Sequence, residues 1–280
     1  MSSPVSVGIF DSGVGGLSIL REVRRALPSL NVIYFADSRY APYGDRTVEQ
    51  ISQRATSASD FLVQRGASAL VVACNTATEV AVDTVRARHS IPVVGLEPAV
   101  KPAVAHSRTS VIGVLATSQT LASAKYSKLI ATHASSARVL SQACPGLVEC
   151  VEAGDLTSDA TRARVAGYVK PLVDQGADTL VLGCTHYPFL LDAIVAAAGP
   201  GITILESAGA VARQLRQRLA AAGIAVPDSG EGSEEFWTTG DPHHVGEVMS
   251  QLLGRAVALR SVPDPWSSLT TTVSRDDSAR

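Results

Sequence analysis

The sequence predicts an α/β protein of two pseudo-symmetric domains, each a mostly parallel sheet flanked by helices, with the active site in the cleft between them. Short runs rich in Val, Ile and Leu alternate with amphipathic stretches of about 12 to 20 residues, a pattern typical of βα units. One segment of the chain occurs twice. Each copy ends in a cysteine where a strand is expected to end, so the duplicated feature is also a candidate functional feature.

Eight apolar runs are expected to be strands, at residues 5–10, 32–36, 69–73, 93–96, 110–116, 139–143, 179–183 and 202–206. Residues 47–65 are expected to form a helix, because Thr47 and Gln50 make a capping box and Gly66 can end the helix. Further segments of this kind are expected at 75–88 and 185–198, and Trp237 fits a C-terminal strand.

Composition argues against two classes of partner, nucleic acids and membranes. A net charge of −2 without a dense Lys/Arg run argues against a nucleic-acid partner. No apolar run approaches the roughly 20 residues that span a bilayer, and the N-terminus lacks the order of a signal peptide, so we expect a cytoplasmic protein without membrane contact. Residues 262–280 are rich in Ser, Thr and Asp, which predicts a disordered tail.

The repeat is carried by LVQRGASALVVAC at residues 62–74 and LVDQGADTLVLGC at residues 172–184, which match at seven of thirteen positions. VGIFDSG at 7–13 also resembles IGVLATS at 112–118. Cys74 and Cys184 are the matched cysteines, whereas Cys144 and Cys150 have no repeat partner and are read as structural. Four scattered cysteines predict free thiols rather than a disulfide framework.

Two matched thiols at strand ends favour proton transfer. Functional groups gather beyond the carboxyl ends of parallel strands, where a helix N-terminus stabilises a thiolate. If the halves face each other, one thiolate could remove a proton from a substrate carbon while the opposite thiol delivers another. A cysteine starts at a pKa of roughly 8.5, so a modest downward shift would suit it to acid–base work.

No cofactor or metal is expected. The four lysines do not lie at Gly-rich strand ends, which disfavours a pyridoxal Schiff base, and the segment from Asp11 to Ser18 has Ser18 where a dinucleotide fingerprint needs its third glycine. Stabilisation of a carbanion must then come from protein donors. Short neutral donors at helix starts suit the carboxylate of an amino acid, and the candidates are Ser12, Asn75, Thr76 and Thr185.

The segments GIFDSGVGGLSIL, ADSRYAPYG, ACNTATEVA and LGCTHYPFL closely resemble the glutamate racemase family, within the pyridoxal-independent aspartate/glutamate racemases. The resemblance implies Cys74 and Cys184 as proton acceptor and donor, with Asp11 and His186 beside them. It implies a glutamate site lined by Asp11, Ser12, Tyr43, Gly44, Asn75, Thr76, Thr185 and His186, with Asp37 and Glu152 in support. It further implies a homodimer, supply of D-glutamate for peptidoglycan, and a first domain of residues 1–98 plus 208–261 around a second of 99–207.

Other functions stay open at this point. A racemase of the same group could act on aspartate or another acid. A cysteine hydrolase or decarboxylase would need only one of the thiols. A binding protein that closes on an amino acid would account for the duplicated halves, although it gives no reason for matched cysteines.

Overall fold

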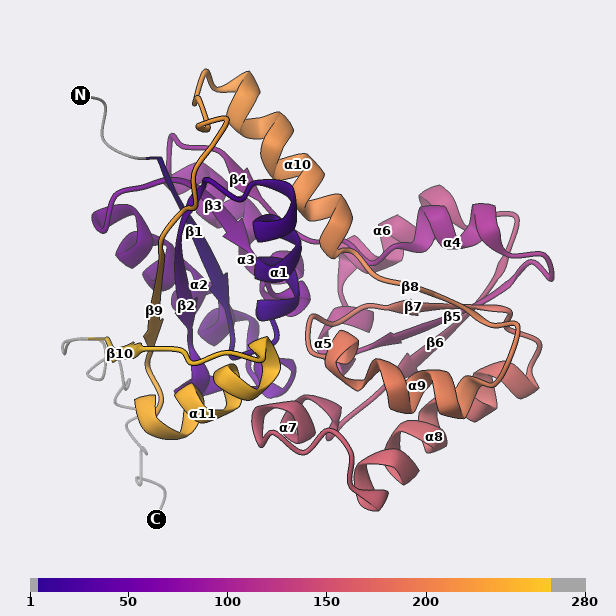
Figure 1. Cartoon of the computed structure of the whole chain (residues 1–280). Helices are drawn as coiled ribbons and strands as arrows, with labels where there is room; N and C mark the ends of the chain where they lie inside the picture. Colours follow the sequence, from indigo (N-terminus) through magenta and orange to yellow (C-terminus); the bar gives the residue numbers. More distant parts are fainter. Residues whose placement is uncertain (1–4, 263–280) are drawn as a thin grey trace, which may run out of the picture.

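The structure, a computed structural model, describes residues 5–262, which form two lobes, each around its own sheet (Figure 1). The first sheet has the order β10-β9-β2-β1-β3-β4 and the second β6-β5-β7-β8. All pairings are parallel, and both sheets are flanked by helices, which confirms the predicted fold class. The strands are β1 (Ser6–Asp11), β2 (Asn31–Ala36), β3 (Ala67–Val72), β4 (Val93–Val94), β5 (Val111–Ala116), β6 (Arg138–Ala143), β7 (Thr179–Leu182), β8 (Thr203–Leu205), β9 (Glu234–Thr238) and β10 (Leu259–Ser261).

The eight expected strands are all present as β1 to β8, with small differences at their ends. The strand β4 stops at Val94, because the N–H of Leu96 turns to the hydroxyl of Thr78 at 3.1 Å instead of continuing the ladder. Ser110 has a left-handed φ of 57°, so β5 begins one residue later. Trp237 lies in β9 as expected, whereas the edge strand β10 is too short and too exposed to have been predicted.

The helices are α1 (Leu17–Ala26), α2 (Val48–Gln64), α3 (Asn75–Arg88), α4 (Val100–His106), α5 (Ser118–Leu121), α6 (Ala124–His133), α7 (Leu147–Glu152), α8 (Asp159–Asp174), α9 (Leu191–Ala198), α10 (Ala208–Ala221) and α11 (Pro242–Leu253). Three 3-10 turns accompany them, namely η1 (Ser38–Tyr40), η2 (Tyr43–Asp45) and η3 (Tyr187–Leu190). The expected helix after Thr47 is α2, with its capping box formed, and Gly66 beyond its end has φ +89°.

One expected helical segment is divided. Residues 75–88 form α3 with the expected bounds, but residues 185–198 form the turn η3 and then α9. Pro188 lies in the first turn, where its missing N–H is tolerated. Cys184 therefore precedes a tight turn, whereas Cys74 directly caps an α-helix.

The sequence repeat corresponds to a structural repeat. The order β2-β1-β3-β4 in the first sheet matches β6-β5-β7-β8 in the second. A Cβ added to Gly8 in β1 would lie 2.9 Å from Leu62 and Leu70, and one added to Gly113 in β5 would collide with their repeat equivalents, Leu172 and Leu180. The two glycines thus allow the same close approach of helix and strand in each half.

The chain returns to the first sheet after the second is complete. The strand β9 pairs with β2, and α10 packs along α1 (Figure 1). The division into 1–98 plus 208–261 and 99–207 stays a prediction. Val262, the first residue of the expected tail, donates its N–H to the Thr238 carbonyl and packs against buried apolar side chains. The rest of that segment lies outside the described residues.

The two lobes share a buried core. One continuous cluster of apolar side chains includes Val14 and Leu17 from the first lobe, Val151 and Tyr187 from the second, and Met249 from α11. The lobes are therefore packed together where α1, η3, α7 and α11 meet. Within residues 5–262, no helix is long and apolar enough to cross a membrane.

We expect Thr47→Ala to lower the free energy of unfolding by about 1 kcal/mol, because it removes the hydroxyl that accepts the N–H of Gln50. Urea denaturation followed by circular dichroism measures the change. Thr132→Ala, at an exposed position in α6, is the control and should change the stability by less than about 0.5 kcal/mol. Equal effects of the two substitutions would show that the capping box contributes nothing of its own.

Candidate active site

Cys74 lies at the carboxyl edge of the first sheet and begins α3. It is the N-cap residue, and its Sγ accepts the N–H of Ala77 at 3.5 Å. Its side chain is buried, at 5% exposed. The sulfur is therefore fixed at the positive end of a helix, as the sequence predicted.

A chain of hydrogen bonds leads from this thiol to a carboxylate. Cys74 Sγ donates to Ser12 Oγ at 3.6 Å, and Ser12 Oγ donates to Asp11 Oδ1 at 3.1 Å. Asp11 is the last residue of β1, the strand beside β3, which is why it lies near the cysteine. The thiol, the hydroxyl and the carboxylate form a continuous path along which a proton can move.

Asp11 also connects the two lobes. Its Oδ2 accepts the hydroxyl of Thr185 at 2.9 Å from the second lobe, and its Oδ1 accepts the N–H of Gly13 at 2.8 Å. Complete burial raises the pKa of this carboxyl from 3.8 to about 6, against the opposing charge of His186. Asp11 therefore titrates close to neutral pH.

Cys184 has a different partner. Its Sγ lies 3.7 Å from Nδ1 of His186, and His186 Nε2 lies 2.6 Å from Glu152 Oε1. Burial alone lowers the pKa of His186, but the contacts with Cys184 and Glu152 outweigh burial and raise this pKa well above 6.5. At neutral pH a protonated imidazole thus stands between the thiol and the carboxylate.

The glycine-rich loop after β1 holds this second chain in place. Glu152 Oε1 also accepts the N–H of Val14 at 2.8 Å. A Cβ added to Gly13 would lie 1.8 Å from that carboxylate oxygen, and one added to Gly15 would lie 2.2 Å from Nδ1 of His186. The glycines are therefore required by close packing against His186 and Glu152 rather than by binding a dinucleotide.

Hydroxyl groups from both lobes converge beside the Cys74 motif. Thr76 Oγ1 lies 2.9 Å from Thr117 Oγ1 and 3.3 Å from Thr120 Oγ1, and all three groups interact. The buried Asn75 amide nitrogen finds no hydrogen-bond partner among residues 5–262. Sequence reasoning missed Thr117 and Thr120. The repeat aligns Ser12 with Thr117, so it could have identified Thr117.

The turn η2, which contains Tyr43 and Gly44, packs against α3 and α5. The Tyr43 hydroxyl donates to Asp37 Oδ2 at 2.6 Å, so this hydroxyl already has an acceptor within the protein. A Cβ on Gly44 would lie 3.1 Å from Thr117 Cβ, which places the Gly44 backbone against the second lobe. All ten predicted site residues and both supporting carboxylates thus lie around Cys74 and Cys184 or contact a residue that does.

Comparison with known proteins identifies the family. The model of the Asp/Glu/Hydantoin racemases matches residues 15–215. This chain belongs to that racemase family. It is 50% identical over 257 residues to the glutamate racemase of Methylococcus capsulatus, which covers 92% of this chain and 95% of the relative. It is 50% identical over 242 residues to that of Herpetosiphon aurantiacus, with 86% and 95% covered.

Solved racemases have the same fold. Glutamate racemase isoform RacE1 of Bacillus anthracis superposes with a TM-score of 0.83 at 33% identity, covering 95% of this chain and 99% of that one. The Escherichia coli glutamate racemase in complex with L-glutamate and the activator UDP-MurNAc-Ala gives 0.82 at 29% identity, with 93% and 98% covered. The resemblance seen in the motifs therefore extends over both lobes of the racemase fold.

The pKa of Cys74 is shifted in the direction opposite to the one that would suit acid–base work. Burial, followed by the charge of Asp11, raises the pKa of Cys74 well above its ordinary value. The helix N-terminus and Ser12 oppose this shift without overcoming it. A positive charge beside Cys74 would favour its thiolate.

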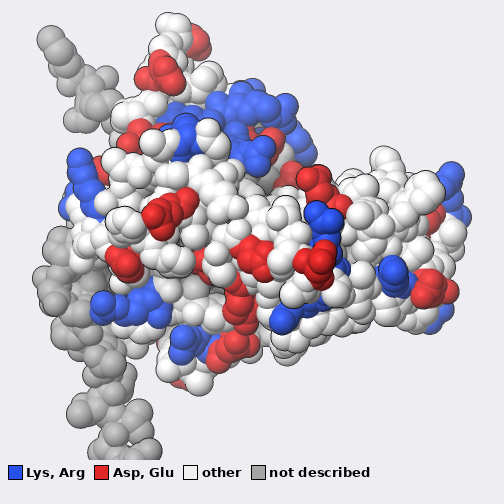
Figure 2. All heavy atoms as spheres, turned by 60° about the horizontal axis from the view of Figure 1, so that its bottom comes forward, with Lys and Arg blue, Asp and Glu red and all other residues white. Residues whose placement is uncertain are grey.

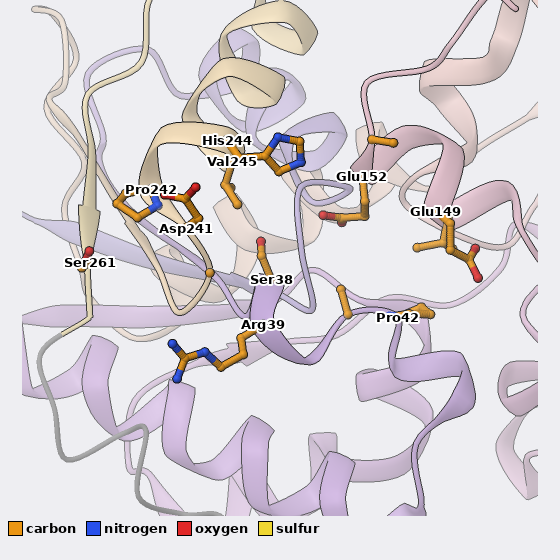
Figure 3. A pocket seen from close by; sticks show the side chains of 14 residues that line it. Ser38, Arg39, Pro42, Glu149, Glu152, Asp241, Pro242, His244, Val245 and Ser261 are labelled. Atoms are coloured by element: carbon orange, nitrogen blue, oxygen red, sulfur yellow. The ribbon is translucent and has the colours of Figure 1, made fainter.

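A cavity of about 760 Å³ lies beside the racemase site (Figure 3). It is bounded by the η1 segment, α7 and the start of α11, and the carboxylate of Glu152 points toward it. In Figure 2, which turns the lower side of Figure 1 forward, acidic side chains lie along the junction of the lobes. Glu152, whose side chain is 18% exposed, thus links the buried His186 to a hollow at this junction.

Cys144 is close enough to Cys184 for their charges to interact, and both act on Tyr187. All four cysteines are free, Cys144 being buried and Cys150 partly exposed. Among the described side chains, no group of three or more His, Cys, Asp and Glu residues could hold a metal ion.

We expect Gly15→Ala to lower kcat about 100-fold, because the added methyl group displaces the imidazole of His186 from Cys184. The measurement is the loss of optical rotation of an amino-acid substrate. Gly167→Ala is the matched control, since a Cβ there meets nothing within 4 Å, and it should keep full activity. Full activity of the Gly15 variant would contradict a role for the His186 position.

Proposed function

We propose that this chain interconverts L-glutamate and D-glutamate by transferring protons between the substrate α-carbon and two thiols, without a cofactor. The observation that carries the proposal is the pair of cysteines at equivalent strand ends, each with its own proton-carrying chain. The relatives of about half-identical sequence are glutamate racemases, which supports glutamate as the substrate. Within this proposal the enzyme is a cytoplasmic homodimer that supplies D-glutamate for peptidoglycan, as the family resemblance implies.

The proposed reaction replaces the α-proton of the substrate with a proton from the opposite face. A thiolate on one face takes the α-proton and becomes a thiol, which leaves a carbanion conjugated with the α-carboxylate. The thiol on the opposite face gives its proton to that carbon and becomes a thiolate. The configuration is inverted, and the reverse reaction uses the same groups with exchanged roles.

The charge of the substrate itself supplies what Cys74 lacks. The ammonium group of glutamate brings a positive charge next to a thiol whose pKa is raised by burial and by Asp11. An opposite charge favours the thiolate. The displaced proton can pass through Ser12 to Asp11, whose pKa of about 6 leaves it mostly ionised and able to accept at neutral pH.

Cys184 is served by a proton donor instead. The raised pKa of His186 keeps the imidazole protonated, and Glu152 holds the ring by its Nε2 while Nδ1 faces the sulfur. The imidazolium can return a proton to Cys184 after each transfer to the substrate. The two thiols thus perform the same reaction with oppositely charged helpers.

The substrate carboxylates require fixed donors. The hydroxyls of Thr76, Thr117 and Thr120 meet at the lobe interface, and the neighbouring Asn75 has a buried amide nitrogen without a partner among residues 5–262. Neutral donors of this kind stabilise a carboxylate that gains negative charge in the transition state. The backbone of Gly44 lies against Thr117 and borders the same hydroxyl cluster.

We expect Cys74→Ala and Cys184→Ala each to abolish full racemisation, because every direction needs both an acid and a base. The measurement is the loss of optical rotation of L-glutamate with no added cofactor, with L-aspartate as the competing substrate. Cys150→Ala, which changes a partly exposed cysteine in α7, should racemise like the wild type.

In heavy water, the D-glutamate formed early should carry deuterium at the α-carbon while the remaining L-glutamate stays largely protonated. Equal early labelling of both enantiomers would point to one shared base. Substantial activity of the Cys184 variant would favour a single-thiol enzyme, and faster turnover of aspartate would correct the substrate. Tight binding of glutamate without any racemisation would favour a binding protein.

We expect kcat/KM to fall about tenfold per pH unit below pH 6. Asp11 has a raised pKa of about 6, so below this pH it becomes protonated and no longer accepts a proton from Ser12. The residual activity of Asp11→Asn should not show this fall in kcat/KM. Asp192→Asn, at an exposed site on α9, should still show it. A wild-type profile that stays flat down to pH 5 would remove Asp11 from the proton path.

A further inference from the structure

We propose that Arg54 is a positioning residue for the substrate loop, defined as residues 37–46, and that it acts through Asp37 and Tyr40. Arg54 lies in the middle of α2, far from the sequence motifs of the family. The inference rests on the proposed glutamate racemase function, because the loop it positions carries Tyr43 and Gly44.

Arg54 and Asp37 form a buried bidentate ion pair. Arg54 Nε donates to Asp37 Oδ2 at 2.8 Å and Nη2 donates to Oδ1 at 2.5 Å. The side chains are 7% and 0% exposed. Removing one partner of such a pair is strongly destabilising, because it leaves an uncompensated charge out of water.

The pair holds the loop at several points. The guanidinium lies over the Tyr40 ring, with Cζ 3.9 Å from the ring centroid. Asp37 Oδ2 accepts the Tyr43 hydroxyl at 2.6 Å, and the backbone N–H of Asp37 donates to the Asp11 carbonyl at 3.0 Å. Thr239, beyond β9, donates its hydroxyl to Asp37 Oδ1 at 2.8 Å. The planar cation therefore fixes one carboxylate and one ring at the same time.

The far side of the loop faces the reacting groups. Burial and the charges of Asp37 and Cys74 raise the pKa of Tyr43, so this residue lies near the thiol as well as the ion pair. Gly44 lies against Thr117, a member of the hydroxyl cluster. A shift of the ion pair would thus move the wall of the glutamate site without touching either thiol.

Lysine cannot reproduce these contacts. It has one compact ammonium group, whereas the arginine here uses two nitrogens on Asp37 and its flat face on Tyr40. We expect Arg54→Lys to raise KM for L-glutamate about tenfold while kcat changes less than about threefold, since binding is lost equally from the ground state and the transition state. Tyr43→Phe should change KM in the same direction by a smaller factor.

The matched control is Arg88→Lys. Arg88 in α3 makes a similar bidentate pair with Asp60 in α2, at 2.5 and 2.7 Å, but it is half exposed and distant from the substrate loop. It should leave KM and kcat unchanged. The double variant Arg54→Met with Asp37→Asn leaves no unpaired buried charge, so it should fold and still show the raised KM.

The experiment measures kcat and KM of racemisation for the wild type and each variant, with thermal unfolding in parallel. A lowered melting temperature with unchanged KM in Arg54→Lys would reduce the pair to a structural role and overturn the inference. A wild-type KM in the double variant would do the same. Failure of the wild type to racemise glutamate would instead remove the proposed function itself, so the two failures are distinguishable.

Discussion

The buried carboxylate of Asp11 is the group on which the site depends. It accepts the Ser12 hydroxyl, the Gly13 N–H and the Thr185 hydroxyl, so a single side chain fixes the glycine-rich loop, reaches the Cys74 thiol and joins the second lobe. Its burial makes these bonds strong and keeps its pKa near 6. If this carboxylate were exposed, water would compete for its hydrogen bonds to the glycine-rich loop and for the proton on the path to Cys74. The fold therefore accepts a costly buried charge at the point where its two halves meet.

Duplication explains why the two thiols are equivalent, and divergence explains why their partners are not. The strands β1 and β5 are repeat equivalents, yet Asp11 corresponds to Ala116 and Thr76 corresponds to His186. Each acid–base helper consequently occurs in only one half. Because the halves face each other, the carboxylate chain ends at one sulfur and the imidazolium at the other. A symmetric backbone thus holds an asymmetric charge distribution, which suits a substrate that is itself asymmetric about its α-carbon.

Sequence reasoning predicted β1 to β8, the repeat and the two thiols because each left a local signal: apolar runs, the spacing of LVxxGAxxLVxxC and residues at strand ends. It could not predict contacts made between distant segments. Arg54 reaches Asp37 from the middle of α2, and Thr117 meets Thr76 only when the lobes dock. The raised pKa of Cys74 depends on burial and on Asp11, and neither effect is visible in the residues around the cysteine. The family motifs named the residues but not their connections.

Burial orders the side chains of the site but makes their ionised forms less stable. The positive charge of the substrate would offset this effect at Cys74. Cys74, Asp11 and His186 are all at most 5% exposed, so each ionised form has lost the stabilisation of water. Asp11 and Glu152 place negative charge around the thiols, balanced in part by His186. An ammonium group entering this region would lower the pKa of Cys74 when a substrate is present and not otherwise. A thiol that is protonated at rest is protected from oxidation, because the thiolate is the reactive form. Activation by a bound amino acid would therefore make the thiol reactive only when the site is occupied, which a permanently lowered pKa would not.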